Sequence, residues 1–129
     1  MSQFTLIFLD DDKIRFLQIH DYLKSLGNHD VSWVKWAKNT SECLQVMSGD
    51  YVLSLDHDLG REGQNYDIVA FCNYIEQYSE DIPLPKLVIV HSMNPVGAIR
   101  IMRALQDTVP VYRVPFGSDL FWECLANVH

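Results

Sequence analysis

The sequence predicts an α/β protein with a five-stranded parallel sheet covered by helices on both faces. Two observations lead to this prediction. Short apolar runs alternate with segments of helical periodicity along all 129 residues. The apolar runs at residues 6–9, 52–55 and 87–90 are nearly continuous and end directly in polar side chains. Strands of this kind are typical of a sheet that is buried on both faces.

An amphipathic helix follows the first strand, which we expect at residues 4–9. Its apolar residues recur at helical spacing and share one face: Phe16, Ile19, Leu23 and Leu26. We expect this helix to end at Gly27, because glycine readily adopts the left-handed conformation that closes a helix. The second strand is expected at residues 31–36. The next helix begins at Asn39, since Glu42 three residues later completes the spacing of a capping box.

We expect the second helix to end at Gly49 and the third strand to occupy residues 51–55. A loop that includes residues 60–63, with a glycine at each end of that stretch, leads into the third helix. The inward positions of that helix are Ile68, Cys72 and Ile75. Pro83 and Pro85 then interrupt the chain, because proline neither continues a helix nor donates a ladder hydrogen bond.

The remaining part of the chain supplies two more strands and two more helices. The fourth strand is expected at residues 87–90, and Asn94 followed by Pro95 is a favourable helix start. The apolar face of this fourth helix is expected to contain Ala98, Ile101, Met102 and Leu105. A fifth strand at residues 109–114 and a closing helix at residues 118–128 complete the pattern.

Composition and charge indicate one globular domain over residues 1–129, with 48% hydrophobic and 21% charged residues. The formal net charge of −7 argues against binding to duplex DNA or RNA, since neutralisation of phosphates supplies much of that affinity. A small phosphorylated ligand is still compatible with this charge, because a bound divalent cation reverses its sign locally.

The sequence favours a cytoplasmic location without membrane attachment. No apolar run approaches the ~20 residues of a membrane span, and the first residues lack the basic start of a signal peptide. Cys43, Cys72 and Cys124 are odd in number and widely spaced among apolar residues. We therefore expect reduced thiols in a core rather than a disulfide framework.

Polar side chains follow three of the expected strands. Asp10, Asp11 and Asp12 follow the first strand, Asp56, His57 and Asp58 follow the third, and His91 and Ser92 follow the fourth. In a doubly wound sheet, ligands bind beyond the carboxyl ends of the strands, where the strand order reverses. If the strand order is 2-1-3-4-5, that point lies between the first and third strands, which both end in acids. The sequence therefore predicts a polar site at this edge.

The clustered acids predict a site for Mg²⁺ or Mn²⁺, which are hard ions that prefer carboxylate oxygens. Like charges raise one another's pKa unless a cation or proton lies between them. We expect Asp11 and Asp56 to bind the ion directly, with Asp10 and Asp58 either binding it or orienting its ligands. The alternative is that Asp58 forms a turn and Asp12 caps the first helix, and for Asp12 we favour the cap.

His57 and His91 are the candidate proton-transfer groups, because imidazole titrates near neutral pH. The alternative for each histidine is a structural hydrogen-bonding role. Ser92 and Asn94 lie where the fourth helix begins, and backbone N–H groups at such a position favour a bound anion. Asn94 can cap the helix at the same time. Arg61 either clamps a phosphate or is a solvated loop residue.

Three segments carry a family resemblance: FLDDD at residues 8–12, LSLDHDLG at residues 53–60 and VHSMNPVGA at residues 90–98. In this order and spacing the chain resembles the cyclic-phosphate-processing receiver-like domain over essentially its whole length. That family is similar to the receiver domains of two-component response regulators. The resemblance implies a flavodoxin-like, three-layer sandwich with the strand order 2-1-3-4-5.

The resemblance also implies roles for individual residues. Asp10 and Asp11 correspond to the metal-binding acids of a receiver domain, Asp56 to the phosphoacceptor, and Ser92 lies near the switch hydroxyl. Two features depart from an ordinary receiver. His57-Asp58 follows the acceptor position, and Val114 stands where the fifth strand would carry a lysine. Phosphorylation-driven switching is therefore not expected, whereas phosphate chemistry over a metal is.

The activity implied by the resemblance is the processing of cyclic phosphates of nucleotides or RNA ends. We expect metal-assisted hydrolysis, in which His57 or His91 removes a proton from water and the other protonates the leaving ribose oxygen. Asp58 would orient one of these imidazoles. Alternatively, Asp56 attacks the phosphate directly and forms an aspartyl-phosphate.

Two non-catalytic readings are alternatives to the enzyme. One is a degenerate receiver that recognises a partner in signalling or host–virus conflict through its fourth helix and fifth strand. The other is a nucleotide-binding module that sequesters a signal without cutting it. Replacing His57 and His91 distinguishes these readings, because an enzyme would lose most of its rate and a binding module would keep nearly all of its affinity.

Overall fold

The structure is a computed structural model that describes residues 4–27, 30–56 and 68–128. Its parallel sheet consists of β1 (Thr5–Leu9), β2 (Val34–Ala37), β3 (Tyr51–Leu55), β4 (Leu87–Val90) and β5 (Val111–Arg113). The strand order is β2-β1-β3-β4-β5, and every neighbouring pair is parallel. The α/β class and the strand order predicted from the sequence are confirmed.

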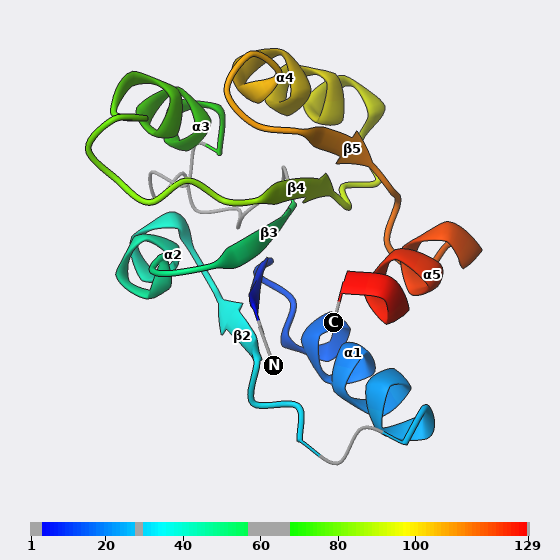
Figure 1. Ribbon diagram of the computed structural model, residues 1–129. Helices are drawn as coiled ribbons and strands as arrows, with labels where there is room; N and C mark the ends of the chain where they lie inside the picture. Colours follow the sequence, from blue (N-terminus) through cyan, green and yellow to red (C-terminus); the bar gives the residue numbers. More distant parts are fainter. Residues whose placement is uncertain (1–3, 28–29, 57–67, 129) are drawn as a thin grey trace.

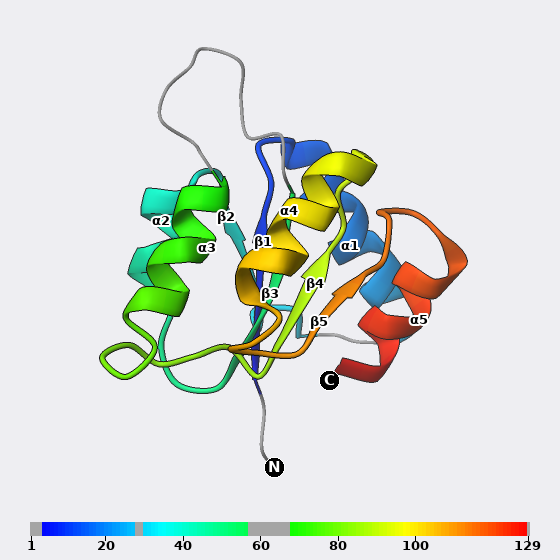
Figure 2. The ribbon, with the colours of Figure 1, turned by 90° about the horizontal axis from the view of Figure 1, so that it is seen from above.

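Helices cover both faces of this sheet (Figures 1 and 2). The five helices are α1 (Lys13–Ser25), α2 (Thr40–Val46), α3 (Ile68–Gln77), α4 (Pro95–Leu105) and α5 (Asp119–Val128). α1 and α5 lie on one face, and α2, α3 and α4 lie on the other. Two buried apolar clusters result, because alternate residues of each strand point to opposite faces. Leu6 and Phe8 of β1 pack toward α1 and α5, whereas Ile7 and Leu9 pack toward the other three helices.

The predicted helix starts at Asp12, Asn39 and Asn94 are confirmed. Each of these side chains accepts a hydrogen bond from a backbone N–H in the first turn of its helix, at 2.9 to 3.1 Å. Glu42 completes the capping arrangement of α2, although it accepts from the N–H of Lys38 and not from that of Asn39 itself. These caps fix where α1, α2 and α4 begin, and α1 and α4 both begin beside the candidate site.

Two strands are shorter than the sequence predicts. β2 begins at Val34 and not at residue 31, because the N–H of Val34 bonds to the carbonyl of Val31 in a turn. β5 begins at Val111 and not at residue 109. The N–H of Val109 is bonded to the end of α4, and Pro110 has no N–H to give to a ladder.

The predictions for two helix ends and for Leu26 need correction. Gly27 has the left-handed conformation that was predicted, with φ of 91°. α1 nevertheless ends at Ser25, so Leu26 leaves the buried face and is 51% exposed. α2 ends at Val46 and not at Gly49, since Met47 is already extended. Gly49, with φ of 59°, instead forms part of the turn into β3.

The three cysteines lie in helices as free thiols. Cys43 and Cys72 are buried in the core, and burial raises the pKa of the Cys43 thiol to about 12. Cys124 is only partly buried. Among the helices that the structure describes, none combines the length and the apolar character that a membrane crossing requires.

The core packing of α4 gives a testable prediction. Ile101 is fully buried between α4 and the sheet, whereas Ile99 of the same helix is 47% exposed. Ile101→Ala is expected to lower the free energy of unfolding by about 2–5 kcal/mol, because it leaves a cavity in a packed core. Ile99→Ala, the matched control, is expected to change it by less than about 1 kcal/mol. Urea denaturation measures both values, and equal losses would contradict this placement of α4.

Candidate functional site

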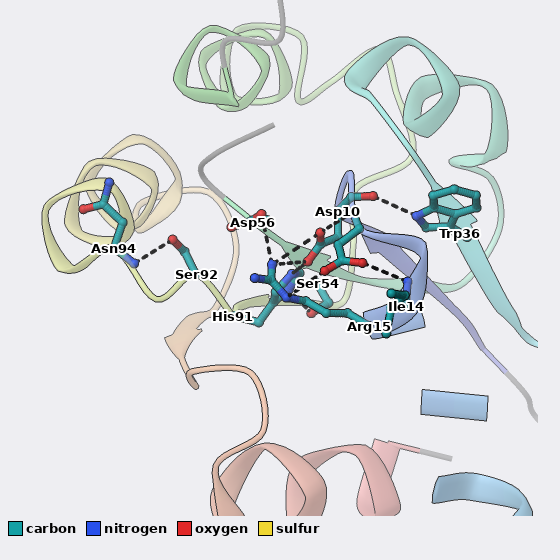
Figure 3. A network of polar contacts seen from close by, with 10 residues as sticks. Asp10, Ile14, Arg15, Trp36, Ser54, Asp56, His91, Ser92 and Asn94 are labelled. Carbon is teal, nitrogen blue, oxygen red and sulfur yellow. Dashed lines mark hydrogen bonds and ion pairs between the residues drawn. The ribbon is translucent and has the colours of Figure 1, made fainter. Parts of the chain in front are cut away.

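Sheet register aligns the polar residues that follow β1, β3 and β4. Leu9 pairs with Leu55, and Leu55 pairs with Val90, so the three strands end at the same level. The next residues continue the ladder: the N–H of Asp56 bonds to the carbonyl of Leu9, and the N–H of His91 bonds to that of Leu55. Asp10, Asp56 and His91 therefore form a row along the carboxyl edge of the sheet (Figure 3).

The alternation of side chains explains why these residues point to one face. Asp10 lies two residues after Phe8, which packs toward α1 and α5. Phe8 pairs with Ser54, so Ser54 and Asp56 project toward the same face, and His91 does so as well. The site is therefore formed by three strand ends together with the helix that begins beside them, α1.

His91 is fully enclosed and uses both of its ring nitrogens. Nε2 lies 2.9 Å from Oδ2 of Asp10, and Nδ1 lies 2.7 Å from Oγ of Ser54. The ring stacks on Phe8, with 4.4 Å between the ring centroids. Burial lowers the pKa of His91, so the ring is neutral. A neutral ring satisfies both contacts when Nε2–H donates to Asp10 and the Ser54 hydroxyl donates to Nδ1.

Asp10 is a buried carboxylate held by several donors. Oδ1 accepts from the N–H of Asp12 at 2.8 Å, and Oδ2 accepts from Arg15 at 3.1 Å and from His91 at 2.9 Å. Burial alone would raise the pKa of Asp10. The hydrogen bonds from His91, Asp12 and Arg15 outweigh burial and hold the pKa below its usual value. Asp10 is therefore ionised at neutral pH.

Arg15 connects the acids of the site. Its Nη1 atom lies 3.1 Å from Oδ2 of Asp10 and 3.6 Å from Oδ2 of Asp56, and its Nε lies 3.7 Å from Oδ2 of Asp12. The guanidinium also lies 5.9 Å from the centroid of the Phe116 ring. Its side chain is 35% exposed, so one cation reaches two buried carboxylates while keeping contact with solvent.

An open depression of about 490 Å³ lies above these groups. Its lining consists of Asp11, Asp12, Lys13, Ile14, Arg15, Asp56 and Met93. Both signs of charge therefore border the same space. This combination suits a phosphorylated ligand together with a cation.

The donor set at the edge of the sheet fits a hard divalent cation. Asp10, Asp56 and His91 each offer a ligand atom, and these atoms lie within 4.8 Å of one another. The two carboxylates are the ligand type that Mg²⁺ and Mn²⁺ prefer. Both ring nitrogens of His91 are already hydrogen-bonded, so in this arrangement His91 orients Asp10 instead of facing an ion.

The other predicted site residues lie as follows. Asp11 is exposed and lines the depression, outside the row of Asp10 and Asp56. Ser92 is buried, and its hydroxyl accepts from the N–H of Asn94 at 3.1 Å. Asn94 caps α4. His57, Asp58 and Arg61 lie outside the residues that the structure describes, so their assigned roles are still predictions.

The sequence analysis did not assign Arg15, Ser54 or Trp36 to the site. Arg15 follows the helix cap Asp12 by three residues, a spacing that places both on one side of the first turn. Ser54 is the polar residue in an otherwise apolar strand, which marks it as a partner for a buried polar group. Trp36 donates from Nε1 to the carbonyl of Asp10 at 2.7 Å, a contact with no signal in the sequence.

Comparison with known proteins identifies the family. The family model for the cyclic-phosphate processing receiver domain matches residues 5–107. The chain belongs to this family. A search of curated proteins finds no match.

Solved receiver proteins share the fold of this family member. A putative response regulator from Chloroflexus aurantiacus has a TM-score of 0.63 and 20% identity, over 98% of each chain. The response regulator TrrA from Thermotoga maritima, solved in complex with Mg²⁺-BeF, has the same TM-score and identity over 98% of this chain and 100% of its own. The receiver domain of NtrX from Brucella abortus has a TM-score of 0.59 and 18% identity, over 96% of this chain and 99% of its own. At these identities the likeness establishes the fold alone.

The contact between Ser54 and His91 gives a second prediction. Ser54→Ala is expected to destabilise the protein by about 1–3 kcal/mol, because the buried Nδ1 of His91 loses its donor. Ser25→Ala, at an exposed serine of α1, is expected to cost less than about 0.5 kcal/mol. Long-range ¹H–¹⁵N spectra at pH 7 should show His91 as the neutral Nε2–H tautomer in the natural protein. A protonated ring, or an unchanged Nδ1 signal in Ser54→Ala, would contradict this assignment.

Proposed function

We propose that this receiver-like domain hydrolyses cyclic phosphates of nucleotides or RNA ends with the help of a divalent cation. The observation that carries the proposal is an open depression lined by Asp56 and Arg15, with the buried carboxylate of Asp10 beside them. Carboxylates suit a hard cation, and a guanidinium suits phosphate oxygens. The name of the matched family points to the same substrate chemistry.

In this proposal Asp10 and Asp56 hold Mg²⁺ or Mn²⁺, and Asp11 at the rim supplies a further carboxylate. A bound divalent cation supplies charge stabilisation for the phosphate and lowers the pKa of a water molecule. His91 keeps Asp10 ionised and oriented, and it acts through that carboxylate because its ring is enclosed.

The reaction is the opening of a cyclic phosphodiester by water. The water oxygen bonds to phosphorus, the bond from phosphorus to one ribose oxygen breaks, and a phosphomonoester results. One proton leaves the water, and one is delivered to the released ribose oxygen. We assign the direct proton transfer to His57, with Asp58 as its orienting partner. Ser92 and Asn94 at the start of α4, together with Arg61, are assigned to substrate binding.

The proposal is tested by incubating the purified chain and Mg²⁺ or Mn²⁺ with 2′,3′-cyclic nucleotides, RNA with a cyclic-phosphate end, and cyclic dinucleotides. Asp56→Asn is expected to lower kcat about a hundredfold or more, because it removes a carboxylate that holds the divalent cation. The matched control is Asp50→Asn. Asp50 lies just before the other end of β3, where it pairs with Lys86 at 3.8 Å, and its loss is expected to leave kcat within about twofold.

The role of His57 is tested in the same assay. His57→Ala is expected to lower kcat by about 10² to 10⁴, the usual range for one acid–base group. Absence of turnover on every substrate, with metal binding retained, would overturn the enzyme and favour a binding or signalling module. Turnover that survives both chelation and Asp56→Asn would overturn the metal site.

A further inference from the structure

Arg15 is the cation that joins the carboxylates of the site. Its Nη1 atom contacts both Asp10 and Asp56, at 3.1 and 3.6 Å, and its Nε contacts Asp12 at 3.7 Å (Figure 3). Asp10 and Asp56 are buried, and they would repel each other without a positive charge between them. The guanidinium therefore holds the position where a divalent cation would satisfy the same two carboxylates.

The side chain of Arg15 is able to exchange between partners. It extends from the first turn of α1 and keeps 35% of its surface in solvent, whereas the Asp10 side chain that it contacts is fully buried. Its contact with Asp56 is loose, at 3.6 Å, and Asp10 retains its bonds to Asp12 and His91 without it. The depression above these acids gives Arg15 a second place to lie.

The position of this charge in the fold sets it apart from an ordinary receiver site. Val114 stands where a lysine would extend from the fifth strand, and it is buried in the apolar cluster beneath α5. Among the described residues, Arg15 of helix α1 supplies the positive charge that contacts Asp10 and Asp56. A guanidinium presents several N–H donors in one plane and binds phosphate through two parallel hydrogen bonds, which an ammonium group does not do.

We propose that Arg15 is an exchangeable counter-ion: it neutralises Asp10 and Asp56 in the metal-free protein and binds the phosphate of the substrate once a divalent cation takes these carboxylates. The second role rests on the proposed function. The first role concerns the metal-free protein and is independent of turnover.

The first role is tested by calorimetric titration with MnCl₂ and by melting temperatures with and without the metal. Arg15→Ala is expected to melt lower than the natural protein without metal, because two buried carboxylates lose their counter-ion. It should bind Mn²⁺ about fivefold more tightly, since the competing cation is gone. The rise of its melting temperature on adding Mn²⁺ should be correspondingly larger.

The matched control is Lys13→Ala. Lys13 carries the same charge on the same turn of α1 and lines the same depression. Its loss should change the affinity for Mn²⁺ by less than about twofold, because dissolved salt screens the interaction between an exposed lysine and an ion that it does not contact. Equal gains in Arg15→Ala and Lys13→Ala, or a weaker affinity in Arg15→Ala, would overturn the counter-ion role.

The second role is tested with inorganic phosphate and saturating Mg²⁺, followed by ³¹P NMR. Arg15→Ala is expected to weaken phosphate binding about tenfold, the usual value of a charged hydrogen-bonded contact. Arg15→Lys should recover only part of this loss, because it keeps the charge without the paired donors. Unchanged phosphate affinity in Arg15→Ala would overturn the second role.

The results separate this proposal from the proposed function. If the natural protein binds Mn²⁺ and phosphate as described but turns over no cyclic phosphate, the enzyme is overturned and Arg15 keeps its assigned roles. If only Arg15→Ala binds Mn²⁺, the counter-ion role is supported in its strongest form. If neither protein binds Mn²⁺, both the metal site and the exchange at Arg15 are overturned.

Discussion

The arrangement of the site depends on one buried charge, the carboxylate of Asp10. A carboxylate removed from water costs several kcal/mol unless donors replace its hydration, so every neighbour of Asp10 has to present an N–H group. The amide of Asp12, the ring of His91 and the guanidinium of Arg15 meet this need. Two of these donors impose conditions elsewhere. Asp12 has to cap α1 so that its amide faces Asp10, and the Nε2 atom of His91 has to carry a proton while Ser54 binds Nδ1 on the other side of the ring.

Because of this dependence, some residues both stabilise the fold and form the site. Asp12 lies in the turn between β1 and α1. Its side chain caps α1 and forms an ion pair with Arg15, and its backbone N–H donates a hydrogen bond to Asp10. The resemblance to receiver domains led us to expect a lysine at the end of the fifth strand, where Val114 stands and is buried. Among the described residues, the cation in contact with both Asp10 and Asp56 is Arg15 of α1. The site is therefore formed by the ends of β1, β3 and β4 and by the first turn of α1.

Much of this could be predicted from the sequence, because its signals are local. Continuous apolar runs predicted the strands, the family resemblance predicted their order, and Asp12, Asn39 and Asn94 marked helix starts through their own side chains. The grouping of Asp10, Asp56 and His91 followed from the rule that parallel strands end at one edge. Arg15 was missed because it lies on α1, and whether its side chain contacts the acids at the edge of the sheet depends on how the helix packs. The late start of β5 was missed because Val109 gives its N–H to a helix end, which no propensity reveals. His57, Asp58 and Arg61 lie beyond the described residues, and their roles still rest on sequence.

The chain of contacts from Ser54 through His91 to Asp10 contains the same three residue types as the catalytic triad of serine hydrolases. Its chemistry is different, because the hydroxyl lies within a central strand and is buried against the helices. No acyl group can approach an oxygen in that position, and the imidazole has no solvent path to a leaving group. Here the Ser54 hydroxyl orients the His91 imidazole through a hydrogen bond, and the imidazole in turn stabilises the Asp10 carboxylate. Whether three such residues catalyse a reaction or only stabilise a buried carboxylate therefore depends more on the accessibility of the serine than on the distances between the side chains.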